Sequence, residues 1–127
     1  MATRSSISMQ LEDGKCRTIY CHNDGYPSYN GRVLKTHYTD KNKVEELIEL
    51  GDISFLEVEV SPPSNESHSF DQPLKGITVA YHRDRGEEKT NARLYESFKN
   101  IREDSVYDYL FVNGEWFLVK NESLISF

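Results

Sequence analysis

The sequence predicts an α+β fold, in which an antiparallel sheet of about five strands has two or three helices packed on one face. Three observations lead to this fold class. Residues 5–22 alternate apolar and polar side chains around Asp13-Gly14, and residues 107–120 form two strand-like runs around Asn113-Gly114, so each segment is typical of a β-hairpin. Residues 41–50 repeat apolar side chains with the period of a helix. The chain of 127 residues is long enough to bury one core, so a single domain over 1–127 is expected.

The first hairpin is predicted to turn at Asp13-Gly14. An Asp-Gly pair favours the two-residue type I′ turn, whose backbone twist matches that of the flanking strands. This turn places Glu12 opposite Lys15, a charge-complementary pair, and leaves the apolar residues of the two strands on matching faces. The predicted register of the strands in 5–22 follows from that turn.

Two helices are predicted after this hairpin. Residues 28–38 are expected to form the first, with an apolar face that includes His37. Thr39 or Asp40 then caps a second helix, and Gly51 occupies the position that follows a helix end. The apolar side chains of the second helix recur at i, i+3 and i+4, as Val44, Leu47 and Ile48.

The middle of the chain is less regular. Residues 53–60 have strand composition with a slip in the alternation, which a bulge or a short 3₁₀ turn would explain. Residues 61–76 are rich in Pro, Ser and Asn and predict a long loop, in which His68 is expected to be solvated. A strand is predicted over 76–82 and a third helix over 90–102.

The hairpin at 107–120 has the strongest local signal. Asn113-Gly114 predicts a type I′ turn that places Val112 opposite Glu115 and Phe111 opposite Trp116. Both faces of this hairpin are apolar, so it is expected to lie centrally in the sheet or under a helix.

Charge and hydropathy narrow the function classes. The 21 acidic residues exceed the 15 basic residues by six, and a protein of this charge is a poor candidate for nonspecific nucleic-acid binding. No apolar run approaches the roughly 18 residues of a membrane-spanning helix. Cys16 and Cys21 match no redox or zinc motif and are expected to be reduced, partly buried thiols.

Three motifs carry a resemblance when they are taken together and in order: YCHNDGYP at 20–27, HRDRGE at 82–87 and LFVNGEW at 110–116. With them the chain resembles a group of small uncharacterised proteins encoded by bacteriophages and prophages. The resemblance implies a setting, the cytoplasm of an infected bacterium. It also implies the role of an accessory protein that acts on host or phage machinery, and it implies no activity.

A repeated His-x-Asp pattern suggests a site for a divalent metal. Each pair follows a predicted strand, where residues two apart project to the same side. If the two strand ends are neighbours, four N and O ligands of the kind that bind Zn²⁺, Mn²⁺ or Fe²⁺ converge. The ligands would be His22, Asp24, His82 and Asp84, with Tyr26 or Glu87 as proton donor or base. The alternative is that these are ordinary polar residues at strand ends.

The segment 83–87 allows a second hypothesis. Arg83 and Arg85 flank an acidic residue beside a glycine and would bind a phosphate or carboxylate through bidentate hydrogen bonds. Glu87 and Tyr26 would complete such a ligand or partner contact, with Tyr26 stacking on a base. The alternative is a cluster of surface ion pairs, which contributes little to stability.

These observations favour a binding function over catalysis. The sequence has no GxSxG, GxGxxG or Walker motif, and it has eight tyrosines, a residue that is common at recognition surfaces. The sequence-based interpretation is an accessory protein that binds or modulates a host or phage protein. The alternative is a small metal-dependent hydrolase or nucleotide-binding enzyme that uses the two His-x-Asp pairs.

Overall fold

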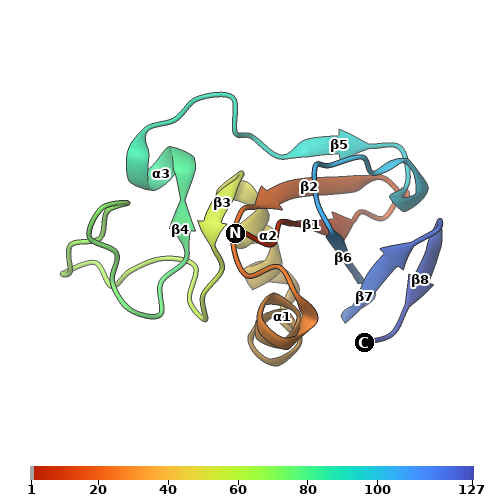
Figure 1. Cartoon of the computed structure of the whole chain (residues 1–127), viewed down its shortest axis with the longest axis horizontal. Helices are drawn as coiled ribbons and strands as arrows, with labels where there is room; N and C mark the ends of the chain where they lie inside the picture. The colour runs from red at the N-terminus through yellow and green to blue at the C-terminus, as the bar shows by residue number, and fades with distance from the viewer. Residues whose placement is uncertain (1) are drawn as a thin grey trace.

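The computed structural model describes residues 2–127 and is organised around one mixed sheet (Figure 1). The strands run in the order β4-β3-β2-β1-β6-β7-β8, and β5 pairs with β2 beside that path. The strands are β1 (Ser5–Gln10), β2 (Cys16–Cys21), β3 (Ile53–Phe55), β4 (Val79–Ala80), β5 (Arg93–Tyr95), β6 (Tyr107–Val112), β7 (Glu115–Lys120) and β8 (Ser123–Ile125). The helices are η1 (Pro27–Gly31), α1 (Arg32–His37), α2 (Lys41–Glu49), α3 (Tyr81–Arg85) and η2 (Phe98–Asn100).

The α+β class is confirmed, but the sheet is larger than predicted and it is mixed. Across residues 2–127 it has eight strands, and two of its pairings, β1 with β6 and β2 with β3, are parallel. The β1–β6 pairing joins residues about a hundred positions apart, from Ser5 opposite Tyr107 to Met9 opposite Phe111. A pairing between distant strands leaves no local pattern in the sequence, so an antiparallel sheet of about five strands was the only expectation that hairpin signals supported.

The first hairpin forms, but the predicted register is wrong by one residue. Its loop has three residues, Glu12 to Gly14, and Leu11 N donates to Lys15 O at 2.7 Å. Gly14 has φ +89°, and Lys15 N donates to the Asp13 carboxylate. The loop begins one residue earlier than the predicted type I′ turn, because Leu11 and not Glu12 pairs with Lys15. The observed register places Ile7 opposite Ile19, which buries both side chains on one face.

The C-terminal hairpin is confirmed with its register. Phe111 lies opposite Trp116 and Val112 opposite Glu115, across a turn in which Asn113 and Gly114 have φ +50° and +83°. A third hairpin, β7–β8, was not predicted. Its turn, Asn121-Glu122, also has two positive φ angles but no glycine, so the sequence signal for it was weak.

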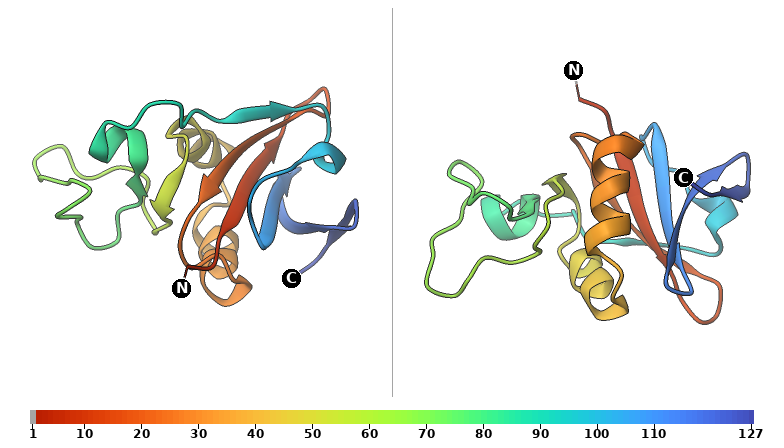
Figure 2. Two further views of the ribbon diagram at one scale, coloured as in Figure 1. Left: turned by 45° about the horizontal axis from the view of Figure 1, so that its top comes forward. Right: turned by 90° about the horizontal axis from the view of Figure 1, so that it is seen from below.

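Helices α1 and α2 pack on one face of the sheet (Figure 2). Helix α2 confirms the predicted second helix: the Asp40 carboxylate accepts from Asn42 N at 3.0 Å, and Gly51 follows the helix with φ +78°. The segment predicted as one helix over 28–38 begins with a π-helical turn, η1, before α1, and His37 is exposed. Within residues 2–127, no helix has both the length and the apolarity that a membrane crossing needs.

The main core lies between these helices and the sheet. Its fully buried members include Ile7, Ile19, Tyr38, Leu47 and Tyr109. A smaller cluster of Cys16, Ile101 and Leu110 covers the opposite face under the turn η2. Because both faces are covered, β1 and β6 are central strands, as the apolar character of the C-terminal hairpin indicated.

Two predicted strands in the middle of the chain are shorter than expected. The strand expected over 76–82 has only two residues, Val79–Ala80, and then continues as helix α3. The strand expected over 53–60 is limited to Ile53–Phe55, with an irregularity opposite β4. The loop 61–76 is confirmed as a segment without helix or strand, and it projects from the sheet beside β4 and α3 (Figures 1 and 2).

The helix predicted over 90–102 is replaced by strand β5, a loop and the turn η2. Arg93 explains the difference, because its Nη2 lies 2.8 Å from carboxylate oxygens of both Asp52 and Glu103. This ion-pair network ties β5 along β2 in an extended conformation and turns Leu94, an apparent core residue of the predicted helix, to solvent with 57% exposure. A tertiary interaction therefore overrides the local helical pattern.

The central position of β1 leads to a stability prediction. Ile7→Ala removes buried methyl groups between the sheet and the helices, and we expect it to lower the free energy of unfolding by about 2–4 kcal/mol. Leu94→Ala, at an exposed position on β5, is the control and is expected to change it by less than about 0.5 kcal/mol. Urea denaturation followed by circular dichroism measures both. Equal effects of the two substitutions would contradict the assigned core.

The exposed part of the long loop leads to a second prediction. Residues 61–67 are all exposed or half-buried and form no regular structure. Limited digestion with a glutamate-specific protease is expected to cut first after Glu66, because the chain there can enter a protease without unfolding the core. Mass spectrometry of the first fragments identifies the bond. A first cut at another loop, such as after Glu88, would show that 61–67 is protected.

Candidate functional site

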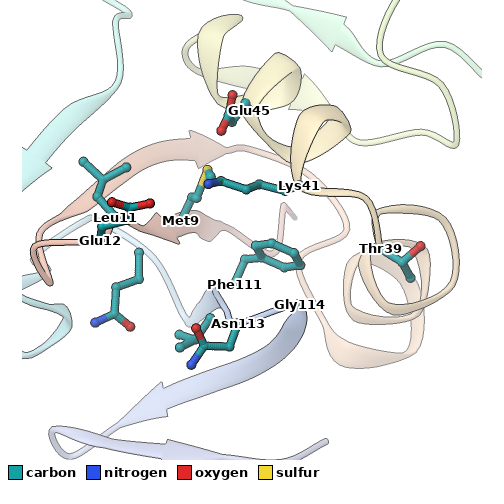
Figure 3. Close-up of a pocket in the computed structure, with 11 residues that line it drawn as sticks. Met9, Leu11, Glu12, Thr39, Lys41, Glu45, Phe111, Asn113 and Gly114 are labelled. Atoms are coloured by element: carbon teal, nitrogen blue, oxygen red, sulfur yellow. The ribbon is translucent and has the colours of Figure 1, made fainter.

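A hollow lies at one end of the sheet, between the start of α2, the β1–β2 turn and the β6–β7 turn (Figure 3). It has a volume of about 630 Å³. Met9 and Phe111, neighbours in the parallel β1–β6 pair, form its floor and are only 3% and 4% exposed. We call this hollow the α2 groove. Its size and its apolar floor are typical of binding sites.

The rim of the α2 groove consists of polar side chains without internal partners in the described part of the chain. Six polar side chains line it, and within residues 2–127 none of them forms a hydrogen bond or ion pair with another residue: Gln10, Glu12, Thr39, Lys41, Glu45 and Asn113. Lys43, which lies between Lys41 and Glu45 in sequence but does not line the groove, is a contrast. It donates to His37 O at 2.9 Å and lies over the Tyr38 ring at 4.5 Å from the centroid. The groove therefore holds donors and acceptors that remain available to a partner.

A second, smaller hollow of about 260 Å³ adjoins the α2 groove. Both are lined by Thr39 and Gly114, so these two residues form the border between them. Trp116 lines the second hollow, and its Nε1 donates to Tyr38 O at 2.8 Å. The Trp116 ring lies 5.1 Å from that of Phe111, centroid to centroid, so the floors of the two hollows are in direct contact.

The chemistry of the α2 groove suits binding. Its lining contains no histidine and no cysteine, and its titrating groups are Lys41 and the carboxylates of Glu12 and Glu45. The two cysteines of the chain are free and buried elsewhere, and burial raises the pKa of each thiol to about 11, which disfavours the reactive thiolate. Carboxylates outnumber cations in the lining, with Glu12 and Glu45 against Lys41.

The structure does not bring the two His-x-Asp pairs together as one metal-binding group. Among residues 2–127, no three His, Cys, Asp or Glu side chains are grouped so that they could hold a metal. His22 follows a strand, as predicted, and its Nδ1 is 2.8 Å from the Tyr20 hydroxyl. His82 and Asp84 lie on helix α3 and not at a strand end, and His82 Nδ1 is 2.8 Å from Glu87 O. Asp24 lies in a turn with φ +56°.

Asp84 is buried in a different cluster, with only 2% of its side chain exposed. Its carboxylate lies 3.2 Å from His68 Nε2 and accepts from Arg83 at 2.9 Å and from Ala80 N at 2.8 Å. Burial alone would raise the pKa of Asp84, but the hydrogen bonds from Arg83 and Ala80 and the charge of Arg83 lower it. Asp84 is therefore an ionised anchor inside the protein.

The expectation that His68 is solvated is wrong, since its side chain is 1% exposed. Leu74 N donates to His68 Nδ1 at 3.0 Å, which leaves the ring proton on Nε2 to be donated to Asp84. Phe70 N also donates to Asp84 O. These bonds fasten the second half of the 61–76 loop to helix α3. No local sequence pattern connects positions 68 and 84, so this pair could not be predicted from the sequence.

The arginines of the predicted phosphate site are engaged within the protein. Arg83 donates to Thr78 O and Val60 O, each at 2.7 Å, in addition to Asp84. Arg85 pairs with Glu87, and its guanidinium lies over the Phe70 ring, 4.2 Å from the centroid. This arrangement matches the ion-pair alternative more closely than a phosphate grip. Tyr26 is 38% exposed, and its hydroxyl donates to Asp24 at 3.3 Å.

The Asp84 cluster leads to a pH-dependent prediction. Asp84→Asn removes the acceptor charge of a buried network, and we expect it to lower the free energy of unfolding at pH 7 by about 2–4 kcal/mol. The pKa of Asp84 in the folded protein is below its ordinary value. The difference in unfolding free energy between wild type and Asp84→Asn is therefore complete above about pH 4, and it is lost as the pH falls through the folded pKa. Urea denaturation between pH 7 and pH 3 measures this.

The control for this experiment is Glu88→Gln, which changes an exposed carboxylate with no ion-pair partner in the described chain. It is expected to change stability by less than about 0.5 kcal/mol. An Asp84→Asn protein that stays as stable as the wild type at pH 7 would show that the cluster contributes nothing to the fold.

Comparison with known proteins yields no relative for this chain. No protein family, no curated protein and no solved structure matches it. The side chains of the α2 groove and of the clusters around it are therefore the evidence on which the functional conclusion depends.

Proposed function

We propose that this protein is a phage-type accessory protein that binds a host or phage protein in the bacterial cytoplasm, with the α2 groove as its contact surface. The sequence motifs support the phage setting through the resemblance that they carry. The observation that carries the binding role is the groove itself, an apolar floor of Met9 and Phe111 within a rim of six polar side chains free of internal partners. Interfaces combine an apolar centre with a polar rim in this way.

Charge favours a protein over a nucleic acid as the partner. The chain has a net charge of −6, and five of its arginines are already paired with acids. These pairs are Arg4 with Asp104, Arg17 with Glu49, Arg83 with Asp84, Arg85 with Glu87, and Arg93 with both Asp52 and Glu103. A nucleic-acid surface needs cations that are free to displace counterions from phosphates. The paired arginines are neutralised, and the net negative charge opposes the approach of a polyanion.

The enzyme alternative has weaker support. A metal-dependent hydrolase needs its ligands at one point, and Asp84, one of the four candidates, has both carboxylate oxygens engaged by His68, Arg83 and Ala80 N. The α2 groove itself offers only Lys41 and the carboxylates of Glu12 and Glu45 as titrating groups. Binding is thus the function that the geometry favours.

The test compares capture of partners by groove variants. The double substitution Glu12→Lys, Glu45→Lys reverses the charge of the rim without breaking an internal contact, and we expect it to reduce retention of the partner about tenfold or more. Glu66→Lys, Glu88→Lys is the matched control, since it makes the same change of net charge at exposed positions away from the groove. Tagged wild-type and variant proteins are incubated with lysate of infected bacteria, and bound proteins are quantified by mass spectrometry.

A protein that is retained by wild type and control but lost from the groove variant supports the proposal. Equal retention by all three, or no retained protein at near-stoichiometric yield with the wild type, contradicts it. Circular dichroism of each variant shows that the comparison is between folded proteins.

A further inference from the structure

We infer that the α2 groove and the smaller hollow beside it form one continuous track for an extended segment of the partner protein. This segment carries two large apolar side chains, and a lysine or arginine lies next to the first of these two side chains. This inference rests on the proposed function and specifies what the groove recognises. Four features of the structure support it: the border between the hollows, their floors, their depth and the charge of the rim.

The border between the two hollows is low. It consists of Thr39, whose side chain is exposed and forms no hydrogen bond within the described chain, and of Gly114, which has no side chain. A Cβ added to Gly114 would meet no atom within 4 Å, so the space above this residue is open. A chain that lies in one hollow can therefore continue over Gly114 into the other.

The two floors are aligned for side chains from the same edge of an extended segment. Phe111 and Trp116 are a cross-strand pair of the β6–β7 hairpin, so both rings lie on the same face of the sheet. Residues two apart in an extended chain also project to the same side, with an intervening residue that points away. Such a segment places one apolar side chain over Phe111 and the other over Trp116, while its backbone crosses Gly114.

The volumes of the hollows set the order of the two contacts. The α2 groove, at about 630 Å³, is more than twice as large as the hollow at Trp116, at about 260 Å³. The first apolar side chain and its basic neighbour therefore share the larger space, and the second enters the smaller one alone. Both floors are closed from below, since Phe111 is 4% exposed and Trp116 is 6% exposed.

The charge of the rim selects the residue beside the first apolar side chain. Figure 3 shows Glu45 on α2 and Glu12 on the β1–β2 turn around the mouth of the groove, with Lys41 extending across it over Met9. Neither carboxylate has an ion-pair partner within residues 2–127, so a lysine or arginine of the partner would find two acceptors. The hollow at Trp116 has one acid, Glu115, and one base, Lys35, which already bonds to Phe127 O. It has no comparable charge preference.

Trp116 supplies the measurement, because it is the only tryptophan of the chain and lies in the floor of the track. The probes are peptides of glycine and serine with capped ends. The one-Phe peptide contains a single Lys-Phe pair, and each two-Phe peptide contains Lys-Phe and a second Phe two or four residues after the first. Titrations follow the Trp116 emission. We expect the better two-Phe peptide to bind about tenfold more tightly than the one-Phe peptide. Replacing its lysine with glutamate should weaken binding about fivefold, and Glu12→Gln, Glu45→Gln should abolish that difference.

Thr39→Gln tests the continuity of the track. The longer neutral side chain narrows the border, so we expect it to remove most of the tenfold gain of the two-Phe peptide over the one-Phe peptide. Thr39→Ser is the control and should retain the gain. Position 39 is exposed, so we expect these variants to fold as the wild type does, and circular dichroism verifies it.

The outcomes separate this inference from the proposed function. If one-Phe and two-Phe peptides bind equally well, or if Thr39→Gln leaves the gain intact, the continuous track is wrong while the α2 groove remains a binding site. If lysine and glutamate peptides bind equally well, the charge preference is wrong. If no peptide changes the Trp116 emission, the track is wrong, and the capture experiment with the Glu12→Lys, Glu45→Lys protein decides independently whether the groove is a contact surface.

Discussion

The parallel pairing of β1 with β6 is the interaction on which the rest of the structure depends. Strand β1 lies between β2 and β6, so it joins the N-terminal hairpin and both helices to the C-terminal hairpins. The same pairing places Met9 beside Phe111 and thereby creates the floor of the α2 groove from residues about a hundred positions apart. Neither half of the chain contains that floor alone. The fold and the candidate site are thus consequences of one strand contact.

Elements with strong local signals were predictable from the sequence. Helix α2 has a capping aspartate, an apolar stripe and a terminal glycine, and the β6–β7 hairpin has Asn113-Gly114, so for both the local preference and the final packing agree. The elements that differ were decided by distant contacts. Arg93 is held extended by Asp52 and Glu103, and the parallel pairs have no turn between their strands to reveal them. In the first hairpin, Asp13 and Gly14 fit either a two-residue turn or the three-residue loop that the structure has, so the sequence does not distinguish the two registers.

The candidate site was harder to predict than the fold, for a related reason. Histidines, arginines and aspartates in short motifs attract attention in a sequence, but here Asp84 and Arg83 bond to each other, to His68 and to backbone groups under a loop. Buried charged groups must find partners of this kind, because an isolated charge in the interior is costly. The side chains left free are ordinary ones, such as Gln10, Glu12 and Asn113, which are distant in sequence and share no motif. Only the topology shows that they surround one hollow.

The position of β1 also has a consequence for how the protein is made. During synthesis the hairpin of β1 and β2 leaves the ribosome first, but the second edge of β1 has no partner until residues 107–111 have been added. At about 5–20 residues per second, roughly 5–20 seconds separate the two events. Over that interval a central strand with Ile7 and Met9 behaves as an open sheet edge, a template for pairing with other chains. The nascent chain is therefore most vulnerable to aggregation before residues 107–111 have been added, and a chaperone that shields residues 5–10 would protect it.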